Sequence, residues 1–296
     1  MDLSSSELIA TRARLAARFG ARLEPWWERL PGTLAELAAR WELTVGDAVG
    51  RGNTSLVVRC RRCVDGRDAI LKLIPDAGVA RGEARALRTW QATARVPLLW
   101  ASDDAAGALL LEAITGERTV AQTRTEVAVP EIAELIGALH RAGPPPGVTP
   151  LADRLEFLFA HWIARQRDDA SIVAAHLRRG RRAARTLARD GGTQVLLHGD
   201  LHPANVLDGG AARGLVAIDP RPCLGDAAFD AIDWVFCGAD EPASWQSRSR
   251  ALAAGLDLDA DRLWAWCRAL AAMLAAGRAA RGAPAAVVDS LLGLTP

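Results

Sequence analysis

The sequence predicts an α+β protein of two lobes, with an antiparallel sheet plus a helix in the N-terminal lobe and mainly helices in the C-terminal lobe. The period of the apolar residues changes from helical to strand-like at Leu43 and returns to helical at about residue 117. The chain has 296 residues, half of them hydrophobic, which is enough to bury a core in each lobe. We place the lobes at 1–115 and 116–296.

The N-terminal lobe is expected to begin with a helical extension over residues 1–42, interrupted at Pro25 and Pro31. Its sheet should then occupy residues 43–115. Residues 43–74 alternate apolar and polar positions around a glycine turn and an Asp-Gly turn, which predicts three strands in an antiparallel meander.

The rest of this sheet surrounds an inserted helix. Residues 79–92 have helical spacing, and residues 96–117 indicate two more short strands around an Asp-Asp/Gly turn. The N-terminal lobe should therefore contain five strands and one inserted helix.

The C-terminal lobe is predicted to be a set of helices with one interruption. Helical spacing extends over residues 129–143, 151–166, 170–190 and 261–282. Between them, residues 193–222 hold two short apolar runs, Val195–Leu197 and Leu215–Ile218, flanked by polar, turn-rich segments.

The composition excludes several classes of protein. A formal net charge of +1 provides no positive field for a nucleic acid or a membrane surface. No apolar signal core opens the chain and no apolar run reaches eighteen residues, so we expect a cytoplasmic protein. We also expect a monomer whose partner is a small molecule. The five cysteines include a Cys-Arg-Arg-Cys run at 60–63, which lacks the second pair that a metal site would need.

The interruption in the C-terminal lobe carries the residues suited to catalysis. HGDLHPANVL at 198–207 contains Asp200 and Asn205, and Asp219 follows the next apolar run. An amide and a carboxylate brought together by a hairpin-like pair of strands suit Mg²⁺, which prefers oxygen ligands. Asp200 would remain to face a substrate hydroxyl, an arrangement typical of phosphoryl transfer.

The partners that this chemistry needs lie upstream. Lys72, the lone lysine of the chain, is placed on the third strand, and Glu83 lies eleven residues later in the first turns of the inserted helix, where it can pair with it. A compact ammonium fits between phosphate oxygens and a carboxylate better than a forked guanidinium does. The GRGNTS segment between the first two strands offers backbone N–H groups for phosphate at Gly52, Asn53, Thr54 and Ser55.

Taken together, the segments at 40–58, 69–73, 109–120, 198–207 and 217–234 resemble the aminoglycoside phosphotransferases, bacterial enzymes with a protein-kinase-like fold. The resemblance is closest to the branch of streptomycin 6-phosphotransferases and hydroxyurea phosphotransferases.

This resemblance implies ATP and Mg²⁺ as cofactors and a role for each matched residue. Asp200 would be the catalytic base, and Asn205 and Asp219 the magnesium ligands. Lys72 and Glu83 would position the phosphates. LLLEAITG would be the hinge between the lobes, where the Glu112 carbonyl and the Ile114 N–H would contact adenine and Leu111 would guard the pocket.

Two positions depart from the family pattern. Gly199 stands between the His and Asp of the catalytic loop, where members associated with streptomycin can carry an aromatic residue. Pro220 follows Asp219, where protein kinases have Phe-Gly, so an activation-loop switch is not expected.

Several residues near the site allow two interpretations. Asp226 and Asp233, aided by Asp240 and Glu241, could recognise a cationic substrate. They could instead be part of a helix N-terminus and a solvent-exposed charged face. Trp234 could be helix core or a platform for a guanidinium or sugar ring.

Two further residues favour structural roles. We expect Asp230 to anchor the fold by accepting N–H groups of the catalytic loop. We expect His198 to bond to nearby backbone, because zinc would need further ligands that the isolated histidines do not supply.

The function expected is an ATP-dependent O-phosphotransferase acting on a small-molecule hydroxyl, with streptomycin as the favoured acceptor. Hydroxyurea or another small metabolite is the alternative within this class. A catalytically inactive nucleotide-binding module is the alternative outside it, and a metal-dependent hydrolase is less favoured.

Overall fold

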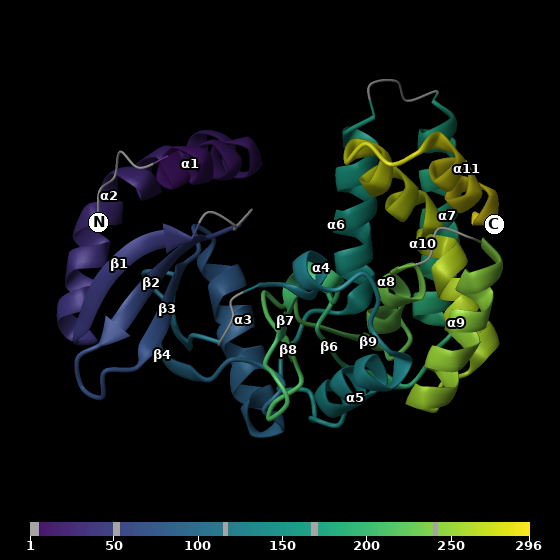
Figure 1. Cartoon of the computed structure of the whole chain (residues 1–296). Coiled ribbons are helices and arrows are strands. Elements are labelled where there is room, and N and C mark those ends of the chain that lie inside the picture. Colours follow the sequence, from purple (N-terminus) through teal and green to yellow (C-terminus); the bar gives the residue numbers. More distant parts are fainter. Residues whose placement is uncertain (1–5, 50–53, 115–117, 167–170, 239–241) are drawn as a thin grey trace. The chain divides into compact units, whose positions relative to one another are not determined.

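The computed structural model describes residues 6–49, 54–114, 118–166, 171–238 and 242–296. The chain divides into two compact units, residues 1–117 and 118–296 (Figure 1). The break lies two residues beyond the boundary expected from the sequence. Each unit has its own core.

The first unit is built on a five-stranded antiparallel sheet with the order β1-β2-β3-β5-β4. The three-stranded meander and the later pair of strands are confirmed. The strands are β1 (Leu43–Val49), β2 (Leu56–Arg62), β3 (Asp68–Leu73), β4 (Leu99–Asp103) and β5 (Ala108–Glu112).

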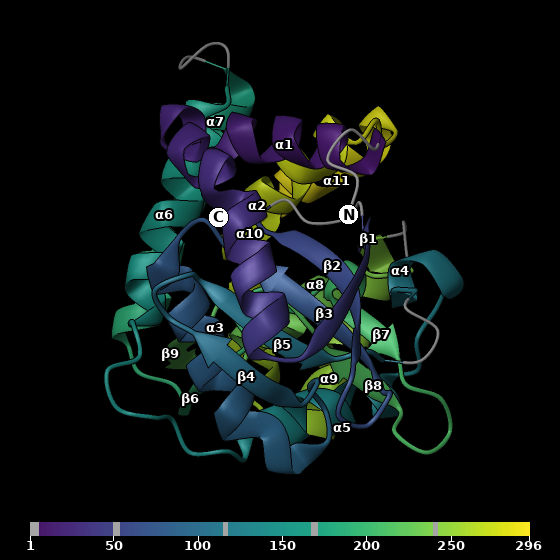
Figure 2. The ribbon, with the colours of Figure 1, turned by 90° about the vertical axis from the view of Figure 1, so that its left-hand side faces the viewer.

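Helices lie on both sides of this sheet. The N-terminal helix α1 (Ser6–Phe19) leads through a short 3₁₀ turn, Gly20–Arg22, into α2 (Leu23–Arg40), which runs across one face of the sheet (Figure 2). Leu30, Leu34 and Leu37 of α2 share a core with the inward side chains of the strands, such as Val58 and Leu71.

Pro31 lies inside α2, so the break that the sequence indicated there is wrong. Proline removes one backbone N–H and crowds the preceding turn, at a cost of about 3 kcal/mol in a helix interior. Burial of the leucine face of α2 at about 25 cal/mol per Å² offsets that cost. Pro25 falls in the first turn of α2, where no N–H is needed.

The inserted helix α3 (Ala77–Trp90) follows β3 directly. Asp76 begins it, because its carboxylate accepts the N–H groups of Gly78 and Val79 at 2.9 and 3.2 Å. Its buried face includes Glu83, Leu87 and Trp90. A short 3₁₀ turn, Gln91–Thr93, ends it.

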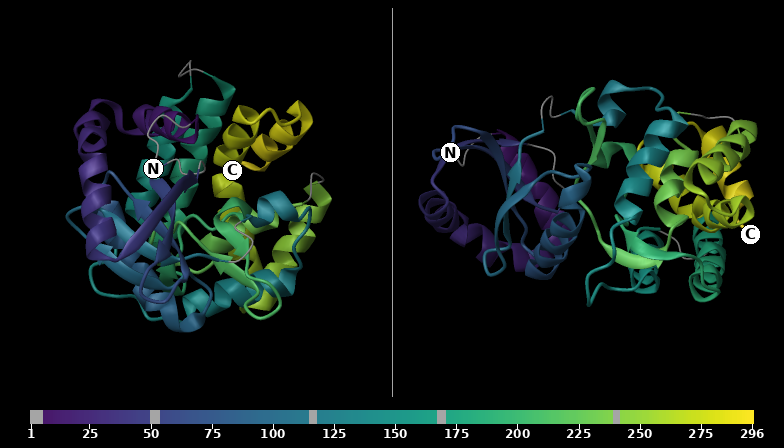
Figure 3. Two further views of the ribbon diagram at one scale, coloured as in Figure 1. Left: turned by 60° about the vertical axis from the view of Figure 1, so that its left-hand side comes forward. Right: turned by 90° about the horizontal axis from the view of Figure 1, so that it is seen from below.

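The second unit is mainly helical, as expected (Figure 3). Its core surrounds the long helix α10 (Ala260–Ala280), which packs against several of the others. The remaining helices are α4 (Val120–Thr123), α5 (Val129–His140), α6 (Leu151–Ala164), α7 (Ile172–Arg189), α8 (Ile232–Val235), α9 (Pro242–Leu256) and α11 (Ala285–Leu294).

Two small antiparallel sheets interrupt the helices of this unit. β6 (Gln194–Leu197) pairs with β9 (Cys223–Asp226), and β7 (Val206–Asp208) pairs with β8 (Leu215–Ala217). The two apolar runs seen in the sequence are thus β6 and β8. They do not pair with each other, because β6 pairs with β9 and β8 pairs with β7. Short 3₁₀ turns lie at Pro203–Asn205 and Phe229–Ala231.

Within the described ranges, no helix has both the length and the apolar character needed to cross a membrane.

Candidate active site

The ammonium of Lys72 is bound by Glu83 inside the first unit. Lys72 lies on β3 and Glu83 in the second turn of α3, and Nζ donates to Oε1 and Oε2 at 2.6 and 2.7 Å. Both residues are 1% exposed. The pairing expected from the sequence is therefore present.

Part of the glycine-rich segment lies beside the strand that carries Lys72, because β2 pairs with β3 through Leu56 and Leu73. Ser55, directly before β2, is 1% exposed, and its hydroxyl has no hydrogen-bond partner among the described residues. A buried hydroxyl without a partner suits an oxygen-rich ligand. Thr54 belongs to the same turn, whereas Gly52 and Asn53 lie outside the described residues.

The segment expected to be the hinge, residues 109–116, begins within β5, and its last two residues lie outside the described residues. Leu111 and Ile114 are buried, at 7% and 6% exposure. Two hydrogen bonds join Glu112 to Leu98: the Glu112 N–H donates to the Leu98 carbonyl oxygen at 2.9 Å, and the Glu112 carboxylate accepts the Leu98 N–H at 3.0 Å. The end of β5 is therefore held to residue 98, directly before β4.

In the second unit, Asp230 anchors the loop that follows β6, as predicted. Its carboxylate oxygens accept the N–H groups of His198 and Gly199 at 2.8 and 2.9 Å, and His140 Nε2 donates to Oδ2 at 3.0 Å. Burial alone would raise the pKa of Asp230, but the bond and charge of His140 and the Gly199 N–H outweigh it and lower the pKa below its usual value.

His198 is also structural, as predicted. It is fully buried, and Nε2 donates to the carbonyl oxygen of Ile218 at 3.0 Å. Burial lowers its pKa to about 4, so the ring is neutral at pH 7. This bond joins the loop to the end of β8.

Asp200 is the carboxylate that this anchored loop presents. Its side chain is 38% exposed, in contrast to the buried Asp230. Oδ1 accepts from Arg154 Nη2 at 3.1 Å, and Oδ2 lies 3.3 Å from Asn205 Nδ2. Each carboxylate oxygen can accept more than one hydrogen bond, so capacity remains for a substrate hydroxyl.

Asn205 and Asp219 lie at the same end of the β7–β8 hairpin. Asn205 directly precedes β7, and its backbone carbonyl accepts the Ile218 N–H at 2.9 Å. Asn205 Nδ2 donates to the Asp200 carbonyl at 2.9 Å, which leaves the amide oxygen as the atom to bind a cation. Asp219 has a left-handed backbone, with φ of 59°.

This donor set fits Mg²⁺, because an amide oxygen and a carboxylate oxygen are hard ligands. Among the described residues, no three His, Cys, Asp or Glu side chains group as metal ligands. A magnesium site here would thus use the amide, one carboxylate and oxygens from the substrate and water.

Gly199 lies in a backbone conformation that other residues strain to adopt. Its φ is 74°, and a Cβ at this position would lie 2.2 Å from the carbonyl oxygen of Arg221. The aromatic residue that related sequences can carry here would not fit this loop.

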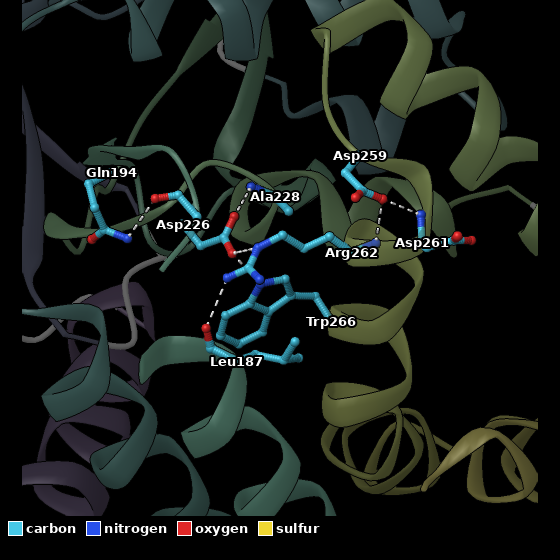
Figure 4. A network of polar contacts seen from close by, with 9 residues as sticks. Leu187, Gln194, Asp226, Ala228, Asp259, Asp261, Arg262 and Trp266 are labelled. Carbon is cyan, nitrogen blue, oxygen red and sulfur yellow. Dashed lines mark hydrogen bonds and ion pairs between the residues drawn. The ribbon is translucent and has the colours of Figure 1, made fainter. Parts of the chain in front are cut away.

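Asp226 belongs to a buried network behind the loop (Figure 4). Oδ2 accepts from Arg262 Nε at 2.5 Å and from Trp266 Nε1 at 2.7 Å, and Oδ1 accepts the Ala228 N–H at 3.0 Å. With 3% exposure, this carboxylate holds β9 to α10. Of the two interpretations of Asp226, the geometry favours the structural one.

Trp234 is fully buried, so the platform interpretation is wrong and the ring is helix core. Asp233 beside it is half-buried. Burial, with a smaller contribution from the charge of Asp200, raises the pKa of Asp233. Asp240 and Glu241 lie outside the described residues.

Two residues of the site were not singled out from the sequence. Arg154 and His140 lie on helices far from the loop in sequence, and contact it only through the fold. His140 ends α5, and Arg154 lies in the first turn of α6. Neither belongs to a local motif, and both helices carry other charged residues, so no signal in the sequence set these two apart.

Comparison with known proteins agrees with this geometry. Residues 40–282 match the family described as aminoglycoside/hydroxyurea antibiotic resistance kinase. The chain is 33% identical over 266 residues to a hydroxyurea phosphotransferase of Kitasatospora aureofaciens, covering 88% of this chain and 76% of the relative. It is 32% identical over 278 residues to a streptomycin 6-kinase of Streptomyces griseus, covering 89% of each.

Solved structures share the fold. A thermostable mutant of aminoglycoside phosphotransferase APH(4)-Ia, in a ternary complex with ADP and hygromycin B, superposes with a TM-score of 0.60 at 17% identity, covering 88% of this chain and 97% of that one. The protein-kinase-like fold expected from the sequence is therefore confirmed. The match over most of the chain shows that the protein belongs to the aminoglycoside/hydroxyurea antibiotic resistance kinases, phosphotransferases that act on small molecules.

Proposed function

We propose that this protein is an ATP- and Mg²⁺-dependent O-phosphotransferase whose acceptor is streptomycin. The observation that carries the proposal is Asp200, an accessible carboxylate on a loop that is otherwise fixed by buried hydrogen bonds. A general base must be held in place and must also be reachable by the hydroxyl that it serves.

In the proposed reaction, Asp200 orients the acceptor hydroxyl and takes its proton. The hydroxyl oxygen forms a bond to the γ-phosphorus while the bond from that phosphorus to the β,γ-bridging oxygen breaks, and ADP leaves. Lys72, held by Glu83, supplies positive charge to the nucleotide phosphates. Ser55, with its unpartnered buried hydroxyl, offers a further donor to those phosphates.

Asn205 and Asp219 would hold the metal through the amide oxygen and the carboxylate. When bound, Mg²⁺ neutralises charge on the phosphate oxygens during transfer. The hinge assignment adds Leu111, Glu112 and Ile114 as the residues that would contact the adenine. A structural neighbour crystallised with ADP supports an adenine nucleotide as the donor.

Streptomycin is favoured as acceptor because it is cationic. Asp233 is a half-buried carboxyl group on α8, and a cation bound beside it would stabilise its charged form against the burial that raises its pKa. Glu241 was proposed from the sequence for the same role. A streptomycin 6-kinase among the relatives supports this acceptor.

Hydroxyurea is the second candidate, since one relative of similar identity is a hydroxyurea phosphotransferase. Hydroxyurea is uncharged at neutral pH and would gain no ionic contact from a carboxylate at the acceptor site. A panel of streptomycin, other aminoglycosides and hydroxyurea, assayed for ATP-dependent phosphorylation, separates the two. No turnover on streptomycin would remove the favoured acceptor.

The test of the mechanism is Asp200→Ala. Transfer should fall by about a hundredfold or more, the usual contribution of a general base, while nucleotide binding measured by calorimetry persists. Asp190→Ala, an exposed aspartate at the end of α7, serves as the matched control. Undiminished turnover in Asp200→Ala would refute the assigned base, and no turnover in the wild type on any acceptor would favour an inactive nucleotide-binding module.

A further inference from the structure

Arg154 makes a two-point contact with the catalytic loop. Its Nε donates to the carbonyl oxygen of Gly199 at 2.5 Å, and its Nη2 donates to Asp200 Oδ1 at 3.1 Å. One guanidinium thus binds the backbone and the carboxylate of two consecutive residues. The side chain is 13% exposed, so water competes little for these bonds.

We propose that Arg154 is a positioning residue for the phosphoryl transfer, which fixes the rotamer of the Asp200 carboxylate so that Oδ2 takes the proton of the acceptor. This inference rests on the proposed function. Asp200 Oδ1 accepts a hydrogen bond from the Arg154 guanidinium, which leaves Oδ2 as the oxygen better able to accept a proton. Among the residues that the structure describes, Oδ2 has only the longer contact with Asn205, at 3.3 Å.

The start of α6 is rigid enough to serve this role. The Leu224 N–H donates to the Thr149 carbonyl at 2.9 Å, directly before the helix. A Cβ on Gly225 would lie 2.4 Å from the Cβ of Leu151, so β9 and the first turn of α6 are in close contact. The helix turn that carries Arg154 is therefore fixed to the strand that pairs with β6, which itself leads into the loop.

Only arginine can make this contact. Nε and Nη2 lie on one planar fork and bind two separate acceptors at once. A lysine would keep the positive charge, but its single ammonium cannot hold both acceptors in the same geometry. Charge and geometry can therefore be separated by substitution.

A purely structural role, in which Arg154 ties α6 to the loop, predicts different behaviour from a positioning role. Loss of a structural tie lowers stability, and a small molecule that cannot join helix to loop does not restore it. Loss of a positioning cation leaves a cavity of guanidinium shape beside Asp200, and an exogenous guanidinium can fill it.

The experiment measures kcat and KM of Arg154→Ala on the best acceptor of the panel, with and without millimolar ethylguanidinium. We expect kcat to fall by about ten- to a hundredfold, as misplacement of a catalytic group by an ångström produces, with the KM for ATP within about twofold of the wild-type value. Ethylguanidinium should restore at least about a tenth of the lost kcat.

The control is Arg185→Ala, which removes an arginine that pairs with Glu156 of the same helix α6, away from the loop. Its kcat should match the wild-type value and should not respond to ethylguanidinium. Failure of ethylguanidinium to raise kcat in folded Arg154→Ala would overturn the positioning role.

Arg154→Lys decides the question if Arg154→Ala does not fold. We expect a melting temperature close to that of the wild type, because the charge remains, and a kcat lowered by about tenfold, because the fork is lost. A wild-type kcat in Arg154→Lys would overturn the inference. Asp200→Ala separates failure of the proposed function from failure of the role of Arg154. Turnover in Asp200→Ala would refute the proposed function. An inactive Asp200→Ala together with wild-type kinetics in the Arg154 variants would refute only the role of Arg154.

Discussion

Lys72 and Glu83 form an ion pair in which both carboxylate oxygens contact one ammonium, at 2.6 and 2.7 Å, with both side chains almost fully buried. A buried pair of this kind tolerates no change of shape. Lys72→Arg should lower the free energy of unfolding by about 1 to 3 kcal/mol through overpacking and raise the KM for ATP.

Urea denaturation and steady-state kinetics measure both effects. Arg67→Lys, an exchange of the same two residue types at an exposed position before β3, is the matched control and should change neither. Wild-type stability together with a wild-type KM in Lys72→Arg would contradict the reason given for a lysine at this position.

His198 should make the stability of the protein depend on pH. The pKa is about 4 in the folded state and about 6.5 when unfolded, so the unfolded chain binds the extra proton between these values. The free energy of unfolding should therefore rise by about 3 kcal/mol between pH 4 and pH 6.5, and should be constant above pH 6.5.

His198→Gln should remove most of this rise, whereas His161→Gln, on α6, should keep it. Chemical denaturation at a series of pH values provides the measurement. Asp230 acts in a different window, because its lowered pKa adds stability that is lost only as pH falls below the usual aspartate range. An unchanged slope in His198→Gln would assign the rise to other groups.

Gly199→Ala should disrupt the catalytic loop. The new Cβ would meet the Arg221 carbonyl oxygen at 2.2 Å, and the backbone φ is 74°. Gly210→Ala is a close match, because its φ is 73° and nothing lies within 4 Å of the added Cβ.

Both variants carry the left-handed penalty of about 1 to 2 kcal/mol, but only Gly199→Ala adds the collision. Thermal melting should therefore show a larger loss for Gly199→Ala, and its kcat should fall, while Gly210→Ala keeps its activity. Equal losses in the two variants would mean that the loop yields freely at Gly199.

Asp226→Asn should destabilise the second unit without changing how the folded enzyme binds its acceptor. Loss of the charge removes the ionic partner of Arg262, whose side chain is 22% exposed, and weakens a buried hydrogen bond, which should cost about 1 to 3 kcal/mol. Asp259→Asn, at the exposed N-terminus of α10, alters a neighbouring carboxylate that accepts two N–H groups and should cost no more than about 1 kcal/mol. A large rise in the KM for the acceptor in Asp226→Asn, with stability preserved, would instead support a role of Asp226 in substrate recognition.

The sequence predicts the local parts of the site well. Lys72, Glu83 and the loop at 198–207 lie within elements whose period or turn residues are visible in the chain. The anchoring role of Asp230 also follows from the resemblance, and its bonds to the His198 and Gly199 N–H groups confirm it.

Contacts that depend on tertiary packing were not predictable in the same way. Arg154 and His140 reach the loop only because α6 and α5 pack beside it. Pro31 does not end α2, because burial of the leucine face of this helix outweighs the cost of a proline in a helix interior. The burial of Trp234 likewise depends on which helices surround α8.

Asp219, which we propose as a magnesium ligand, has a left-handed backbone that lowers stability at the position where its carboxylate would serve catalysis. A non-glycine residue with φ of 59° gives up roughly 1 kcal/mol or more that glycine would retain. Asp219→Gly should therefore melt at a temperature no lower than that of the wild type and yet lose phosphoryl transfer. Selection of this protein for heat resistance alone would tend to remove that aspartate, so any engineering of a hardier variant must screen for turnover at every round.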